Sequence, residues 1–214
     1  MESGVSRPDI YALPEFTTLS CNRKRLSMFF ILIHKIARGI SRRIENWFAQ
    51  HWAYSYLKRR NAELPPTKHI LFQGMPIINV KDSAKVSIGK EFICRSGVTN
   101  AIDNSSCSKI FVDNGARLTI GDFSGISNTV IYCAQSITIG NSVNIGAGTM
   151  IFDTNFHSTD WRDRQYRQND VVNRRNAPVV ISDCAFIGAR CIICKGVTIG
   201  ERSMVAAGSV VVCD

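Results

Sequence analysis

The chain repeats every six residues over its C-terminal part. From Ile181 onward an aliphatic residue opens each block of six, and the fifth place of each complete block holds a small or β-branched residue. This period predicts short strands that turn a corner every six residues, with the aliphatic and small residues pointing inward. Three such sides close a coil, and stacked coils bury a continuous aliphatic column, so the repeat predicts a parallel β-helix. The residues that open the blocks are Ile181, Ile187, Ile193, Ile199, Val205 and Val211.

The same register is present earlier in the chain. It runs through Ile139, Ile145 and Ile151, and one coil before that through Ile120. The separation between Ile120 and Ile139 is 19 residues rather than 18, which indicates a bulged corner. Weaker copies begin near Val80, so we expect the first coils to be irregular. The period itself does not determine the handedness of the β-helix.

Most of the net charge belongs to the front of the chain. The 214 residues include 26 Lys and Arg against 17 Asp and Glu, a net charge of +9. Residues 1–69 hold twelve basic and five acidic residues (+7), whereas residues 70–214 hold fourteen and twelve (+2). The nearly neutral repeat region has no basic stripe interleaved with aromatic residues, which argues against nucleic-acid binding.

Residues 26–60 have the pattern of an amphipathic helix, with apolar residues at three- and four-residue steps between basic positions. Two interpretations remain open. A basic amphipathic helix can lie on an anionic membrane surface, here through residues 23–60, or its apolar face can pack on the main domain or a neighbouring subunit. The apolar run Leu26–Ile33 is far shorter than the roughly 20 residues that span a bilayer. Pro65 and Pro66 end the helix.

We therefore expect a basic, largely helical extension over residues 1–66 and a repeat domain over residues 67–214. No charged-then-apolar leader with a small-residue cleavage site opens the chain, so its eight cysteines predict reduced thiols in a cytoplasmic protein. Cys191 and Cys194 have C-x-x-C spacing, but the repeat register points their side chains in different directions. We therefore expect no metal site.

Residues from about 80 to 214 resemble the hexapeptide-repeat acyltransferases. The resemblance rests on the stretch IFDTNFHSTDWRDR, followed after a polar segment by NAPVVISDCAFIGARCIICKGVTIGERSMVAAGSVV. The likeness is strongest to the sugar O-acetyltransferases of capsule, lipopolysaccharide and exopolysaccharide synthesis, and to the maltose and galactoside acetyltransferases. It implies an all-β fold, a left-handed parallel β-helix with an N-terminal α-helical extension. It also implies acetyl-CoA as co-substrate and a homotrimer whose active sites lie between subunits.

The resemblance places the general base at His157. The repeat breaks for 30 residues between Ile151 and Ile181, and an insertion at about 153–178 is typical of a functional loop. Imidazole exchanges a proton near neutral pH, so it can take the proton of a hydroxyl that attacks a thioester. Asp153 and Asp160 are the nearby carboxylates that could fix its tautomer. Asp153 has an equal chance of capping a corner.

Substrate and cofactor positions also follow from the resemblance. Asn128, on the coil before His157, could orient a sugar hydroxyl. Arg164 and the other loop arginines could contact an anionic substrate or coenzyme A, or could form a solvated face balanced by aspartates. Coenzyme A in the family lies along the outside of the later coils, and the matching positions here are Ala189, Ala207 and Gly208.

The resulting prediction is an acetyl-CoA-dependent O-acetyltransferase that acts on a sugar hydroxyl of a surface polysaccharide or its precursor. One alternative is an N-acetyltransferase acting on an amino-sugar nucleotide. The other is a catalytically silent β-helix scaffold, because Val212 and Cys213 replace the threonine and lysine usual in the family. Relatives in the family usually continue beyond the position of Asp214, and whether this sequence is truncated there stays open.

Overall fold

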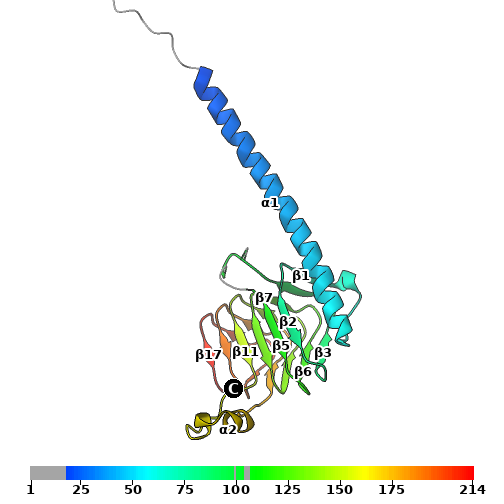
Figure 1. The fold of residues 1–214 in the computed structure, drawn as a ribbon, viewed down its shortest axis with the longest axis vertical. Helices are drawn as coiled ribbons and strands as arrows, with labels where there is room; N and C mark the ends of the chain where they lie inside the picture. Colours follow the sequence, from blue (N-terminus) through cyan, green and yellow to red (C-terminus); the bar gives the residue numbers. More distant parts are fainter. Residues whose placement is uncertain (1–17, 99, 104–106) are drawn as a thin grey trace, which may run out of the picture. The chain divides into compact units, whose positions relative to one another are not determined.

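The structure is a computed structural model that describes residues 18–98, 100–103 and 107–214 (Figure 1). It divides into two compact units, Met1–Ser41 and Arg42–Asp214. Helix α1 (Thr18–Arg59) begins in the first unit and ends in the second. The predicted helix is therefore confirmed, with a start earlier than the apolar pattern indicates.

The second unit is a parallel β-helix. In the described part of the chain, seventeen short strands form three parallel sheets, and each strand pairs with the strand three places further along. The first sheet contains β1 (Ile70–Gln73), β4 (Phe92–Arg95), β7 (Gly125–Ser127), β10 (Asn144–Ile145), β13 (Phe186–Ile187) and β16 (Met204–Val205). The second contains β2 (Ile77–Val80), β5 (Lys109–Val112), β8 (Val130–Cys133), β11 (Met150–Phe152), β14 (Ile192–Ile193) and β17 (Val210–Val211). The third contains β3 (Lys85–Ile88), β6 (Arg117–Ile120), β9 (Ser136–Ile139), β12 (Val179–Ile181) and β15 (Thr198–Ile199).

The predicted aliphatic column forms the core. Ile120, Ile139, Ile181 and Ile199 stack in register through the third sheet and are all buried. Because Ile120 pairs directly with Ile139, the extra residue of that coil is absorbed in its corners. Six coils result, the last formed by β16 and β17 alone within the described residues.

Polar side chains tie one stack of corners together, between the third and first sheets. The backbone N–H of Lys90 donates to Asp122, that of Asp122 to Asn141, and that of Asn141 to Asp183, each over 2.8 Å. Each acceptor lies one coil further along than its donor, so this corner ladder links four successive coils.

The end of α1 packs on the first coil. Ala49, Ala53 and Leu57 are fully buried. Gln50 accepts a hydrogen bond from the backbone N–H of Phe72 (2.8 Å) and donates to the carbonyl of Ile70 (3.0 Å). The helix thereby covers the strand that would otherwise be an open edge of the first sheet. These contacts place the end of α1 in the same compact unit as the β-helix.

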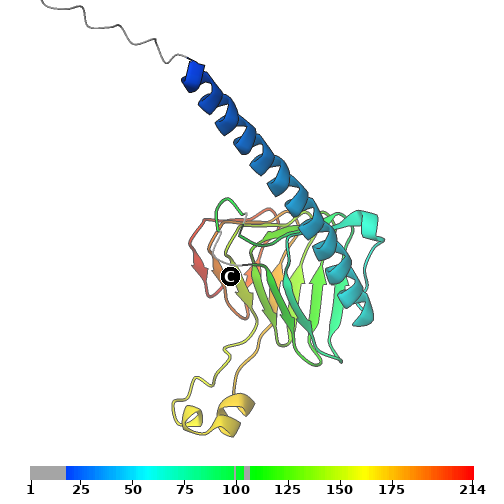
Figure 2. The ribbon, with the colours of Figure 1, turned by 45° about the horizontal axis from the view of Figure 1, so that its top comes forward.

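A long loop interrupts the fourth coil between β11 and β12, where the sequence predicts an insertion. It contains the short helices η2 (Asp163–Gln165) and α2 (Arg167–Val172). Figure 2 shows this segment, which we call the histidine loop (residues 153–178), projecting away from the strands.

Candidate active site

The histidine loop leaves the β-helix through a narrow neck. Thr154 and Asn176 form an antiparallel bridge. The N–H of Asn155 donates to the carbonyl of Arg175 (3.1 Å), and the N–H of Ala177 donates to that of Asp153 (2.9 Å). Both ends of the loop are therefore held together at its base.

His157 is paired with a carboxylate from the returning half of the loop. Its Nδ1 lies 2.6 Å from Oδ2 of Asp170, a residue of α2. The other carboxylate oxygen of Asp170 accepts from the N–H of Ser158 (2.7 Å). The hydrogen bond from His157 is the main cause that lowers the pKa of Asp170, followed by the bond from Ser158. Asp170 is therefore ionised at neutral pH and accepts a hydrogen bond from Nδ1–H of His157.

This pairing leaves Nε2 as the nitrogen of neutral His157 with a free lone pair. The His157 side chain is 68% exposed, whereas that of Asp170 is 14% exposed. A histidine whose Nδ1–H is fixed by a carboxylate and whose Nε2 faces solvent can accept a proton from a bound hydroxyl or amine.

Ser158 organises the turn that follows His157. Its hydroxyl donates to Asp163 (2.7 Å), and its carbonyl accepts from Arg164 Nη1 (2.6 Å). The residue is almost completely buried although it lies in a polar loop. Neither Ser158 nor Asp170 is singled out by the sequence, because their partners are brought close only by the fold of η2 and α2.

Asp153 is not the carboxylate beside His157, which corrects one sequence-based assignment. It is fully buried and accepts hydrogen bonds from three successive backbone N–H groups, those of Ala134, Gln135 and Ser136 (2.6–2.8 Å). The three donors lie at the corner between β8 and β9. Asp153 therefore caps a corner, the second of the two roles that the sequence left open.

Asp160 and Arg164 also differ from their sequence-based roles. Asp160 accepts from the N–H of Arg162 (2.9 Å) and lies 3.4 Å from its guanidinium group, so it stabilises a local turn instead of His157. Arg164 donates to the carbonyl of Ser158. Its guanidinium group thus supports the loop in this structure, and its predicted contact with a substrate is not part of the observed geometry.

Asn128 is a buried corner residue. It is fully buried, with a left-handed φ of 40°. Its Oδ1 accepts from the N–H of Gly97 (2.8 Å), and its Nδ2 donates to the carbonyls of Gly97 and Asp103. The amide ties the β7–β8 corner to the segment between β4 and β5, and a contact with an acceptor is not part of the observed geometry.

The predicted cofactor positions lie on a different stack of corners. Ala189, Ala207 and Gly208 occur where the chain passes from the first to the second sheet, and the N–H of Gly208 donates to the carbonyl of Ala189 (2.8 Å). A Cβ on Gly188 would fall against the backbone N of Ala207, so only glycine fits between these coils. Binding of coenzyme A along this stack stays a prediction.

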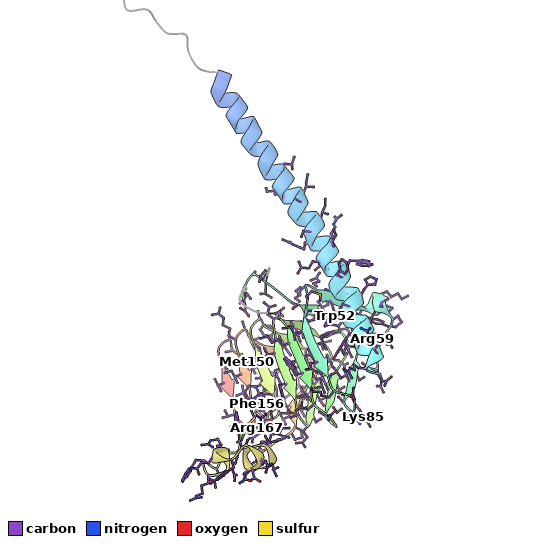
Figure 3. The ribbon with its side chains drawn as sticks, in the orientation of Figure 1. Trp52, Arg59, Lys85, Met150, Phe156 and Arg167 are labelled. Atoms are coloured by element: carbon purple, nitrogen blue, oxygen red, sulfur yellow. The ribbon has the colours of Figure 1, made fainter. Side chains whose placement is uncertain are left out.

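An aromatic cluster anchors the start of the histidine loop on the outside of the second sheet. The ring of Phe156 lies 4.8 Å from that of Tyr132 and 5.5 Å from that of Phe152, measured between centroids. Phe156 has a left-handed φ of 61°, which a non-glycine residue adopts only when its surroundings hold it there. In Figure 3, Phe156 lies between the strand that carries Met150 and the loop helix that carries Arg167. This cluster positions the residue immediately before His157.

A second contact anchors the other half of the loop. The hydroxyl of Tyr132 donates to Asp113 (3.1 Å), whose carboxylate lies 3.7 Å from the guanidinium group of Arg174. Partial burial is the main cause that raises the pKa of Tyr132, and the adjacent Asp113 adds to it. Tyr132 therefore stays protonated and continues to donate at neutral pH.

The outward faces of the second and third sheets differ in polarity. Outward positions of the third sheet mostly hold Lys, Arg, Ser and Thr, including Lys85, Arg117, Thr119 and Thr138, with Val180 as an apolar exception. Outward positions of the second sheet are mostly apolar, and several are well exposed. They include Ile77, Phe111, Val130, Tyr132, Met150, Phe152, Ile192 and Val210. We call this surface the apolar face; it borders the corner from which the histidine loop leaves.

The two cysteines with C-x-x-C spacing differ in burial. Cys191 is buried in the core and Cys194 lies half-buried on the outside, as the register predicts for residues that point in different directions. Among the residues that the structure describes, no group of three His, Cys, Asp or Glu side chains is arranged to hold a metal ion.

Comparison with known proteins gives a family match at the end of the chain. Residues 178–213 match the model of the bacterial transferase hexapeptide, which comprises six repeats. A hexapeptide-repeat acetyltransferase from Vibrio cholerae, solved with acetyl coenzyme A, is 31% identical over 65% of this chain and 61% of its own, with a TM-score of 0.42. The chain thus spans less than two thirds of that protein's length.

A mutant of AntD, an N-acyltransferase from Bacillus cereus solved with dTDP and coenzyme A, is 19% identical over 74% of this chain and 78% of its own. The TM-score is 0.50. This likeness shows the fold, and the predicted left-handed parallel β-helix is confirmed. The matched segment and the three-sided architecture show that residues 178–213 consist of hexapeptide repeats of the bacterial transferase type.

Proposed function

We propose that the protein transfers the acetyl group of acetyl-CoA to a sugar hydroxyl, with His157 as the general base. The observation that carries this proposal is the His157–Asp170 pair, which leaves Nε2 exposed in a loop of a hexapeptide-repeat β-helix. Nε2 takes the proton of the acceptor hydroxyl while its oxygen attacks the carbonyl carbon of the thioester. The carbon–sulfur bond breaks, and the thiolate takes the proton from the imidazolium to give free coenzyme A.

The acceptor that we propose is a sugar of a surface polysaccharide or its precursor, modified in the cytoplasm, where acetyl-CoA is made. The resemblance of the histidine loop sequence to the sugar O-acetyltransferases supports this class. The same base would serve an amino group, so an amino-sugar nucleotide is the acceptor to compare with it.

We also propose that three copies assemble around the apolar face. A row of exposed apolar side chains on one sheet, with polar residues at the equivalent positions of another, is typical of a surface that a partner covers. Since the histidine loop begins at the edge of this face, a neighbouring copy would border His157. The corner that contains Ala189, a predicted coenzyme A position, lies at the opposite edge of the same sheet. A neighbouring copy could therefore bring its Ala189 corner close to His157.

The test is the release of free thiol from acetyl-CoA in the presence of sugars, sugar nucleotides and amino-sugar nucleotides. We expect turnover with a hydroxyl acceptor, and His157→Ala should reduce kcat/KM by at least ~100-fold. The matched control is His69→Ala, which should keep wild-type turnover. His69 is suitable because its Nδ1 lies 2.5 Å from Glu91, in a similar pair on the first coil.

Three outcomes would contradict parts of this proposal. Turnover by His157→Ala at the wild-type rate would remove the residue from the mechanism. Turnover with amino acceptors alone would replace O-acetylation by N-acetylation. Absence of coenzyme A binding, measured by calorimetry, would favour a scaffold without catalysis.

A further inference from the structure

Helix α1 carries apolar side chains that nothing in its own unit covers. An α-helix turns by about 100° per residue, so the exposed apolar side chains within each unit all lie inside an arc of about 100° around the helix axis. Within each unit, the exposed apolar side chains that the structure describes therefore share one side of the helix. The side chains are 53–58% exposed and comprise Leu32, Ile36 and Ile40 in the first unit, and Ile44, Trp47 and Phe48 in the second.

This side differs from the one that packs on the β-helix. Ala49, Ala53 and Leu57 are fully buried, and they lie about 80° or more around the helix from Trp47 and Phe48. Packing on the first coil thus buries one side of the end of α1 and leaves the side chains of Trp47 and Phe48 exposed. The two interpretations from the sequence apply to different sides of the same helix.

Nearly all the charged residues of α1 are basic. Thr18–Arg59 contains nine Lys and Arg residues and a single acidic residue, Glu45, a net charge of +8. Lys35 and Arg43 are exposed, and each lies roughly 90–100° around the helix from the middle of the apolar side of its own unit. A helix with an apolar side, a tryptophan and flanking basic residues has the composition of helices that lie in the interface of an anionic bilayer.

A second copy of the helix fits these observations less well. The apolar residues recur at three- and four-residue steps, so their spacing alone does not distinguish a coiled coil from a membrane-bound helix. The charge does, because +8 on each helix would repel a parallel copy, while anionic headgroups would neutralise it. Within the described residues, the helices lack a continuous apolar stretch that could span a bilayer. We propose that α1 binds along the surface of an anionic membrane through its exposed apolar side.

The experiment is co-sedimentation of the full chain with vesicles of phosphatidylcholine alone or of phosphatidylcholine with phosphatidylglycerol at about 3:1. We expect binding to the anionic vesicles only, weakened by salt because exposed charges are screened. The double variant Trp47→Ser, Phe48→Ser should bind at least about tenfold more weakly, since two apolar side chains no longer enter the interface. The charge variant Lys35→Glu, Arg43→Glu should lose binding as well.

Phe123→Ser provides the matched control, because Phe123 is 56% exposed on the β-helix, close to the exposure of Phe48. It should bind like the wild type, and circular dichroism should show that every variant folds. No binding of the wild type to anionic vesicles, or equal binding of the double variant, would overturn the proposal. So would loss of self-association in the double variant without any change in vesicle binding, because the apolar side would then be a contact between copies. None of these readouts depends on acetyl transfer.

Discussion

Nε2 of His157 is available only because Asp170 occupies the other ring nitrogen. Asp170 in turn is fixed by its second hydrogen bond, from the N–H of Ser158, and by its place in α2. The carboxylate is thirteen residues away in the sequence and returns to His157 through the turn formed by η2 and α2. Asp170 therefore acts as a positioning residue, which sets the tautomer and the direction of the imidazole.

Replacing Asp170 should slow catalysis without weakening cofactor binding. An asparagine has no negative charge to hold Nδ1–H, so we expect Asp170→Asn to lower kcat by about 10- to 100-fold. The KM for acetyl-CoA should stay close to that of the wild type, and Asp170→Glu should recover part of kcat. Steady-state kinetics over a range of pH separates these effects. Wild-type kcat in Asp170→Asn would show that the pair has no role in turnover.

At the scale of single elements, the strands could be predicted and the corners could not. Strand positions follow from the aliphatic period, because an inward residue in every strand is needed for the column from Ile120 to Ile199. Corners are set by side-chain hydrogen bonds that no period records. Asn128 therefore looks like a site residue in the sequence and Asp153 like either a site residue or a corner cap, but the structure shows both as buried caps.

The cap at Asp153 makes a prediction about stability. Asp153→Ala leaves three partly buried backbone N–H groups without their acceptor, and at about 1 kcal/mol each the free energy of unfolding should fall by about 3 kcal/mol. Urea denaturation measures this change, and kcat of the folded variant should change little. The opposite result, full stability with lost turnover, would return Asp153 to the catalytic role that the sequence suggested.

The corner ladder makes a prediction about acid stability. Hydrogen bonds from the side chain and the backbone N–H of Asn141 lower the pKa of Asp183. The stabilisation is therefore complete above the pKa of an unfolded aspartate, about 4, and is lost as the pH falls through the lower folded value. Urea denaturation between about pH 7 and pH 3 should show a smaller loss of stability in Asp183→Asn than in the wild type. Parallel pH dependence of the two proteins would contradict this origin.

At the scale of the whole molecule, the surfaces of the protein differ in charge and polarity. The net charge of +9 belongs mainly to α1 and its surroundings, while the repeat region is nearly neutral. The basic end, the apolar face and the histidine loop are thus separate surfaces of one chain. The residue types of the basic end and the apolar face are visible in the sequence. The geometry of the histidine loop is not, because it depends on contacts between distant residues such as Tyr132, Asp113 and Arg174.

The apolar face predicts how assembly responds to charge. Val130→Asp places a carboxylate in the middle of that face, where a neighbouring copy would leave it without water, so the proposed trimer should dissociate. Thr138→Asp at an outward position of the third sheet is the matched control and should leave the assembly intact. Sedimentation velocity measures both. A Val130→Asp variant with the mass of the wild-type assembly would exclude this face as the interface.

The narrow neck of the histidine loop has a consequence for how such a chain can change over time. Strand pairing on either side of the neck continues from β9 to β12 and from β11 to β14 without using any residue of the loop. Insertions and deletions beyond Thr154 and Asn176 therefore leave the pairing register of the coils untouched. The β-helix can be inherited as a fixed frame while this one loop is lengthened, shortened or exchanged.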